Sequence, residues 1–167
     1  MKKINYNSTN TIIGIIVMVF SFVIFTLTVE PTASYWDCAE YISTSAKLQV
    51  GHPPGAPLFQ MLGAIFSTFA FESDQIALAV NMMSVTSSAL TILFLFWSIS
   101  HLIKQQVGTE DQLISLNEAF KIFGSSILGC LTFTFTDSFW FNAVEAEVYA
   151  MATMILSLLF WLGLKWV

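Results

Sequence analysis

Long apolar runs separated by short polar segments dominate this chain. Residues 11–29 form an apolar run without a charge, and residues 76–102, 122–136 and 148–165 are mostly apolar. A helix needs about 20 apolar residues to cross the hydrocarbon core of a bilayer. The pattern therefore predicts an all-α integral membrane protein with about four transmembrane helices in a single domain, residues 1–167.

The longest polar segment begins directly after the first apolar run. Ser34 and Asp37 have the three-residue spacing of a helix capping box, with aspartate in place of the usual Glu or Gln. Gly51 and the prolines that follow it are typical of the end of a helix. These signals predict a short helix over residues 35–50.

A second helix is expected in the same external loop, which spans residues 30–75. The stretch 58–71 is apolar, but it is too short to cross a bilayer. Short apolar helices of this kind lie in the membrane interface or re-enter the membrane from one side. We expect both helices of this loop to lie at the membrane surface, the second as an interfacial or re-entrant element.

Composition agrees with a membrane protein and excludes a soluble domain. Hydrophobic residues make up 56% of the chain and charged residues 10%, which is too few charges to cover the surface of a soluble domain of this size. Cys38 and Cys130 are too few and too far apart for a metal knuckle or a disulfide framework. The expected partners include the lipid bilayer and no nucleic acid.

The placement of lysine predicts the orientation of the chain. Cytoplasmic loops of membrane proteins carry an excess of positive charge. With four spans and a cytoplasmic N-terminus, five of the six lysines lie inside and only Lys47 lies outside. If residues 58–71 also crossed, only two lysines would remain inside. The four-span topology is therefore favoured, and it places eight of the eleven acidic residues on the external side.

Ionisable residues gather at the start of this external loop. Asp37, Glu40, Thr44 and Lys47 recur at intervals of three and four residues, so they would line one face of the predicted helix. His52 follows in a rigid, proline-rich turn. Asp37 can also be a capping residue, Glu40 a solvated charge and His52 a turn residue, because exposed charges are the norm. Ionisable groups held at a membrane boundary favour the functional interpretation.

A second polar cluster lies between the last two apolar runs, on the same predicted side. Glu145 and Tyr149 are four residues apart and would share a helix face, whereas Glu147 would point elsewhere. A short loop between apolar helices also needs polar residues, which is the simpler interpretation. The sharper hypothesis is that two acidic loops converge on one external site.

These motifs resemble a known family. The segments PTASYWDCAEY (31–41), KLQVGHPPGAPL (47–58) and FWFNAVEAEVY (139–149) are similar to signatures of the membrane family catalogued as domain of unknown function 2723. That family includes large bacterial membrane proteins and proteins of the O-mannosyltransferase type. The resemblance covers essentially the whole chain and implies that it is the N-terminal fragment of a longer protein.

The resemblance also implies an activity and a site. It implies the N-terminal part of a GT-C type glycosyltransferase in a bacterial inner membrane, acting at the external face. Such an enzyme transfers sugar from a polyprenyl-phosphate donor to a hydroxyl of a protein or glycan acceptor. Asp37 matches the acidic position of the first external loop, with Glu40 as its companion, and which of the two is the base stays open. Substrate-binding roles would fall to Lys47, His52, Glu145, Glu147 and Tyr149.

Other interpretations compete with a glycosyltransferase. The carboxylates are compatible with a divalent cation, but no residue pattern demands a metal or another cofactor. A multispan transporter would explain charged groups beside a helix broken by proline. However, transporters bind their substrates near the middle of the membrane, and the apolar runs are nearly free of charge. A non-catalytic membrane assembly subunit is the third alternative.

Overall fold

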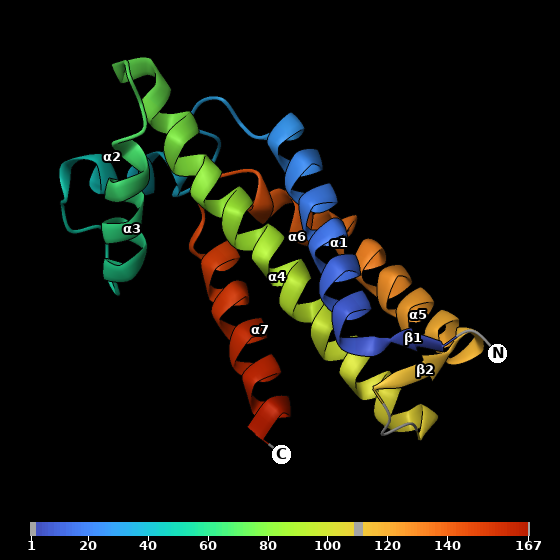
Figure 1. Cartoon of the computed structure of the whole chain (residues 1–167). Coiled ribbons are helices and arrows are strands. Elements are labelled where there is room, and N and C mark those ends of the chain that lie inside the picture. Colours follow the sequence, from blue (N-terminus) through green and yellow to red (C-terminus); the bar gives the residue numbers. More distant parts are fainter. Residues whose placement is uncertain (1–2, 109–111, 167) are drawn as a thin grey trace.

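The computed structural model describes residues 3–108 and 112–166, which form a bundle of long helices joined by one long and several short connections (Figure 1). The long helices are α1 (Tyr6–Thr28), α4 (Ile76–Val107), α5 (Leu116–Thr134) and α7 (Val148–Trp166). Helices α1, α4 and α7 are each long and apolar enough to cross a membrane. The predicted all-helical membrane fold is confirmed, with three spans and a fourth if α5 and the helix after it cross together.

The fourth span is broken rather than continuous. Helix α6 (Asp137–Ala143) follows α5 at an angle of 70°, so this pair is either a broken span or a re-entrant loop. Edge-to-face contacts of Phe25 on α1 with Phe139 and Trp140 hold α6 against the bundle. Helix α5 also begins before the predicted residue 122, because Ser115 and Glu118 form a complete capping box that starts it at Leu116.

Helix α4 is the centre of the bundle. It packs against α1, α5 and α7, and its buried side chains include many serines and threonines. Small residues let helix backbones approach closely inside a membrane. On α1, Gly14 faces Trp97 and Phe96 of α4, and a Cβ atom there would lie 2.7 Å from the Trp97 Nε1 atom. Close packing of small residues therefore explains how α4 can lie against several helices at once.

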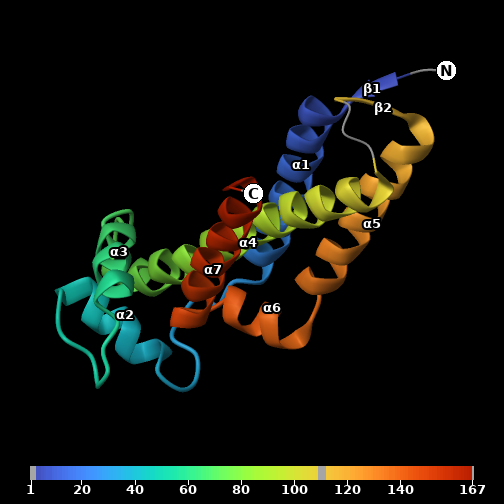
Figure 2. The ribbon, with the colours of Figure 1, turned by 90° about the horizontal axis from the view of Figure 1, so that it is seen from below.

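The loop of residues 30–75 folds into a helical hairpin beside the first turns of α4 (Figures 1 and 2). Its helices are α2 (Cys38–Lys47) and α3 (Pro57–Ser67), both shorter than the predicted 35–50 and 58–71. Proline at the first position suits α3, because no hydrogen bond is lost there. At Gly63 of α3, a Cβ atom would lie 2.5 Å from the Ser45 hydroxyl oxygen of α2, so the two helices touch at this glycine.

Both predicted ends of the first loop helix are wrong. Trp36 has a left-handed backbone with a φ of 62°, and the helix starts after it, with Asp37 at the N-cap. Ser34 does not form the predicted capping box: its hydroxyl donates to the Glu145 carboxylate, 111 residues away. At the other end Leu48 is also left-handed, and its N–H caps the Ser45 carbonyl. The helix thus stops before Gly51.

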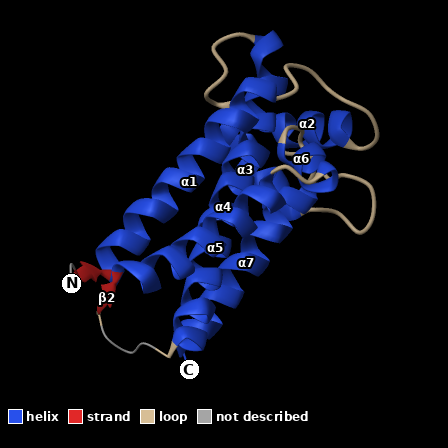
Figure 3. Cartoon of the chain, turned by 90° about the vertical axis from the view of Figure 1, so that its right-hand side faces the viewer, coloured by secondary structure: helices blue, strands red, loops and turns tan. Residues whose placement is uncertain are grey.

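A two-stranded antiparallel sheet lies at the opposite end of the bundle, and the sequence pattern did not predict it. Strand β1 (Lys3–Asn5) pairs with β2 (Leu113–Ser115), so that Ile4 lies opposite Ile114. Ile114 is fully buried against the main core. Figure 3 shows these strands at one end of the helices and the long loop that carries α2 and α3 at the other. The sheet fixes the start of α1 to the start of α5.

Candidate functional site

The two polar clusters lie at the same end of the bundle, because consecutive long helices run in opposite directions (Figure 1). A backbone hydrogen bond of 2.9 Å from the Glu30 N–H to the Val144 carbonyl joins their two loops directly. The hydroxyl of Ser34 adds a side-chain bond to Glu145. Residues that follow α1 are thus held against residues that precede α7.

Asn81 of α4 fixes the segment that leads into the site. Its side-chain amide donates to the carbonyls of Glu30 at 2.6 Å and Thr32 at 2.9 Å. Its oxygen lies 3.8 Å from the Cys38 sulfur, at the first residue of α2. Asn81 and Cys38 are both fully buried. Because buried amides need partners, Asn81 and this segment hold each other in one arrangement.

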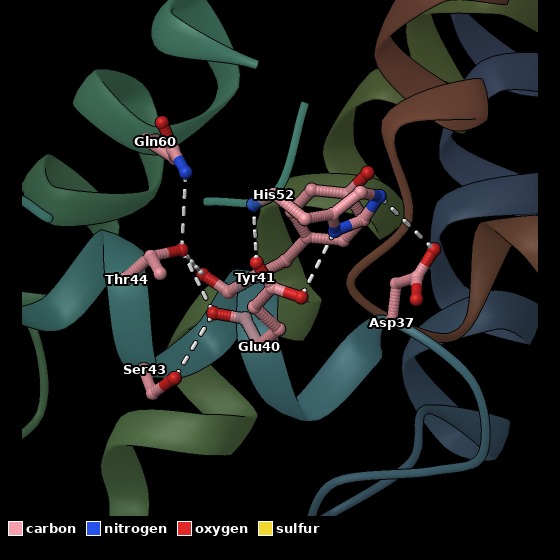
Figure 4. A network of polar contacts seen from close by, with 7 residues as sticks. All are labelled: Asp37, Glu40, Tyr41, Ser43, Thr44, His52 and Gln60. Atoms are coloured by element: carbon pink, nitrogen blue, oxygen red, sulfur yellow. Dashed lines mark hydrogen bonds and ion pairs between the residues drawn. The ribbon is translucent and has the colours of Figure 1, made fainter. Parts of the chain in front are cut away.

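Glu40 and His52 form the tightest polar contact of the site (Figure 4). One Glu40 oxygen accepts the His52 backbone N–H at 2.6 Å, and the other lies 2.9 Å from the His52 Nδ1 atom. Gly51 permits this approach, because a Cβ atom there would lie 3.0 Å from Glu40 Oε1. Both carboxylate oxygens of Glu40 are therefore engaged by one residue of the proline-rich turn.

This contact sets the charge of both groups. The backbone N–H of His52, followed by its ring, holds the pKa of Glu40 below its usual range. In return, the hydrogen bond and the charge of Glu40 raise the pKa of His52. The other ring nitrogen, Nε2, lies 3.9 Å from Asp37 Oδ2. The imidazole thus stands between two carboxylates and favours its charged form.

The helices beneath the site support this pair. The Thr44 hydroxyl donates to the Glu40 carbonyl at 2.7 Å and accepts from the Gln60 amide of α3 at 3.2 Å. The Tyr41 ring packs on Phe59, with 5.2 Å between ring centroids, and lies 6.3 Å from the imidazole of His52. Thr44, predicted to share a face with Glu40, is buried between α2 and α3. It supports the site rather than lining it.

The second loop brings two buried carboxylates. Glu145 and Glu147 are 3% and 7% exposed, although they lie in a short connection between α6 and α7. Burial raises the pKa of Glu145, and the Ser34 hydroxyl partly offsets this effect. Burial, and then the charges of Glu145 and Asp37, raise the pKa of Glu147 to about 7. Glu147 therefore exchanges its proton near neutral pH.

A cleft joins the two loops. It has a volume of about 190 Å³, and its lining includes Asp37 together with Glu145, Glu147 and Tyr149. Trp36, Phe141 and Asn142 complete its walls. Four of the seven predicted site residues thus line one space, and His52 and Glu40 adjoin it through Asp37. The exception is Lys47, which lies at the far end of α2, about 15 Å from Asp37 by the rise of a helix.

Three groups of the site could hold a metal ion. One ligand atom from each of Asp37, Glu40 and His52 falls within 4.8 Å of the others. Two carboxylate oxygens and an imidazole nitrogen suit a divalent cation such as Mn²⁺ or Zn²⁺. In this structure, however, both carboxylate oxygens of Glu40 already contact His52.

Sequence reasoning missed three residues that position the site: Ser34 as a partner of Glu145, Asn81 and Gln60. Asn81 is an amide within an apolar run, and Gln60 lies in an apolar stretch. A polar side chain inside an apolar run was the signal that could have marked Asn81 and Gln60, since such groups need a buried partner.

Comparison with known proteins gives the family. Residues 37–167 match the model of the protein O-mannosyl-transferase TMEM260 N-terminal domain. The chain is 26% identical over 142 residues to protein O-mannosyl-transferase tmem260 of Dictyostelium discoideum. This alignment covers 84% of this chain and 15% of that protein. The chain is 28% identical over 136 residues to protein O-mannosyl-transferase TMEM260 of Mus musculus, covering 81% of this chain and 17% of that protein.

The chain thus spans less than a fifth of the length of these relatives. No solved structure matches it significantly. The family match begins at Asp37, the first residue of the cluster formed with Glu40 and His52, and it includes every residue that lines the cleft except Trp36. The chain belongs to the family of the TMEM260 N-terminal domain of protein O-mannosyl-transferases.

Proposed function

We propose that the full-length protein is a membrane glycosyltransferase of GT-C type that transfers mannose from a polyprenyl-phosphate donor to a protein hydroxyl at the external face. The cleft shared by Asp37, Glu145, Glu147 and Tyr149 is the observation that carries this proposal. It gathers acidic groups from two loops at one end of a membrane bundle. The mannosyltransferase relatives make mannose the sugar to test first.

We assign the base to Asp37. Both oxygens of Glu40 are engaged by His52, whereas the side chain of Asp37 is 53% exposed and lines the cleft. Asp37 would take the proton of the acceptor hydroxyl as its oxygen attacks the anomeric carbon of the sugar. The bond from that carbon to the phosphate oxygen breaks, and the electron pair leaves with the phosphate.

The other groups serve charge and orientation. The His52 imidazolium, kept charged by Glu40, would donate to the departing phosphate, which stabilises the charge that develops there. Glu145, Glu147 and Tyr149 would hold the sugar or the acceptor on the opposite wall of the cleft. Lys47 is too far from Asp37 to share this phosphate, so we assign it to lipid headgroups at the membrane surface.

The test is transfer by the full-length protein in membranes. Membranes are incubated with labelled polyprenyl-phosphate mannose, and with donors carrying other sugars, and label in protein is measured. Asp37→Asn should lower the rate by about a hundredfold or more, the usual range for a catalytic base. Asp74→Asn removes an exposed carboxylate of the same loop and should leave the rate unchanged.

Two results would contradict the proposal. One is a normal transfer rate for Asp37→Asn in membranes that contain wild-type amounts of the variant. The other is no transfer from any donor by membranes that instead show flux of a solute, which would favour the transporter.

A further inference from the structure

A cavity of about 530 Å³ lies at the end of the bundle opposite to the candidate site. Tyr6 and Asn7 contribute to it from the first turn of α1, and Lys165 from the last turn of α7. Helix α4 contributes the remaining lining residues from its last turns and C-cap: His101, Lys104, Gln105 and Gly108. The ends of three long apolar helices thus line one space.

The lining of this cavity is basic. Lys104, Lys165 and His101 face it, and none of the seven lining residues that the structure describes carries a carboxylate. Within residues 3–108 and 112–166, both ion pairs closer than 4.0 Å belong to His52 at the other end of the molecule. A lysine in the last turn of a helix also interacts favourably with the helix dipole, which is sufficient to explain the position of each lysine taken alone. It does not explain why two lysines from different helices face one concave space.

One wall of the cavity is held rigid. Tyr6 is 6% exposed, and its hydroxyl donates to Ser100 of α4 at 3.4 Å. The ammonium of Lys104 lies 4.6 Å from the centroid of the Tyr6 ring, a cation–π contact that aims the lysine along this wall. His101 and Gln105 are joined by a side-chain contact of 3.2 Å. The charge of Lys104 is thus placed before any ligand arrives.

We propose that this cavity binds the phosphate group of an anionic lipid headgroup between α1, α4 and α7. Basic pockets between transmembrane helices, at the depth of the headgroups, are suited to such lipids. The ligand supplies the negative charge that Lys104 and Lys165 lack among the described residues of the cavity lining. The site is separate from the sugar-transfer cleft and does not depend on that function.

The test measures lipid retained by the full-length protein. Protein reconstituted in phosphatidylcholine vesicles, with or without phosphatidylglycerol, is extracted and its bound lipid is counted by native mass spectrometry. Replacing both Lys104→Gln and Lys165→Gln should weaken retention of phosphatidylglycerol roughly tenfold or more, from the usual attraction of a lysine to an anionic membrane surface. Lys121→Gln removes an exposed lysine of α5 that does not line the cavity and should retain the lipid like wild type.

Further arms separate the outcomes. Lys165→Gln alone changes an exposed residue, so it reports on the site even if the double variant folds poorly. Millimolar inorganic phosphate that displaces phosphatidylglycerol would identify free phosphate as a ligand of the same groups, and failure to displace it assigns the site to lipid. Equal retention by all variants, or equal loss in Lys121→Gln and the cavity variants, would overturn the proposal.

Discussion

The two loops of the candidate site present their carboxylates in opposite ways. Glu40 sits at the surface, and hydrogen bonds from His52 favour its charged form. Glu147 is buried beside Glu145, and burial favours its neutral form. Both lie near Asp37: Glu40 is linked to it through the His52 ring, and Glu147 lines the same cleft.

The two glutamates are therefore suited to two different roles in one site. A fixed charge such as Glu40 holds a partner in place and keeps that partner charged. A carboxyl group with a pKa near 7 can give or accept a proton, or donate a hydrogen bond while neutral. Residue type alone does not distinguish the two, since both are glutamates. Their surroundings do.

Among the substitutions that test this contrast, Glu40→Gln is expected to have the largest effect. The variant keeps the size of the side chain but loses the charge that holds His52, so transfer should fall by about ten- to a hundredfold. Since Glu40 raises the pKa of His52, activity that needs charged His52 is lost as pH rises through that pKa. In the variant this loss should begin at lower pH, which a pH–rate profile in membranes measures.

Glu72→Gln is the matched control, because it makes the same change at an exposed position outside the cleft. A Glu40→Gln protein whose rate and pH profile both match this control would show that the charge of Glu40 has no part in transfer.

The second largest effect is expected from Asn81→Ala. It tests whether hydrogen bonds to the backbone, rather than charged groups, hold the segment that contains Glu30 and Thr32 in place. The substitution removes the donors to the Glu30 and Thr32 carbonyls in a buried region, which should lower the free energy of unfolding by about 2 kcal/mol. Thermal unfolding in detergent measures the loss. Asn117→Ala, at an exposed position of α5, should change stability little, and equal losses in the two variants would reject this anchoring role.

Gly63→Ala should perturb the Glu40 side of the site and spare the Glu147 side. The new Cβ atom would meet the Ser45 hydroxyl oxygen at 2.5 Å and push α2 from α3, at a cost of about 1–3 kcal/mol. Gly124→Ala, on α5, has no neighbour within 4 Å and should be neutral or slightly stabilising, as alanine is in helices. The comparison fails if both variants unfold at the same temperature.

The smallest effect is expected from Glu147→Gln. The folded protein binds a proton at Glu147 up to a pH of about 7, whereas an ordinary glutamate releases it near 4.5. The stability of wild type should therefore fall as pH rises between these values, and the variant should lose less over the same window. Unfolding temperatures measured across this pH window test the difference. Parallel plots of unfolding temperature against pH for the two proteins would show that burial does not raise the pKa of Glu147.

The fold was predictable where the signal was long and local. Three apolar runs correspond to α1, α4 and α7, because length and hydrophobicity alone decide whether a helix can cross a bilayer. The start of α2 was not predictable in this way. Ser34 had a suitable local partner in Asp37, but its hydroxyl bonds Glu145, and no pattern of nearby residues reports a partner so distant in the chain.

The site was predictable in composition more than in arrangement. Clustering of ionisable residues in an apolar chain drew attention to Asp37, Glu40 and His52, which the structure does bring together. Their different roles depend on Gly51, which lets the proline-rich turn approach Glu40. This close approach is visible only in the three-dimensional structure. Lys47 matched the helical spacing, yet the rise along α2 carries it away from Asp37.

The small sheet has a consequence for how the chain is made. Strand β1 lies directly before α1, but its partner, β2, begins at Leu113. Because a ribosome makes a chain from its N-terminus, α1, the helical hairpin of α2 and α3, and α4 are all synthesised before β2 can pair with β1. The start of α1 can therefore be tied to the start of α5 only after these helices have been made.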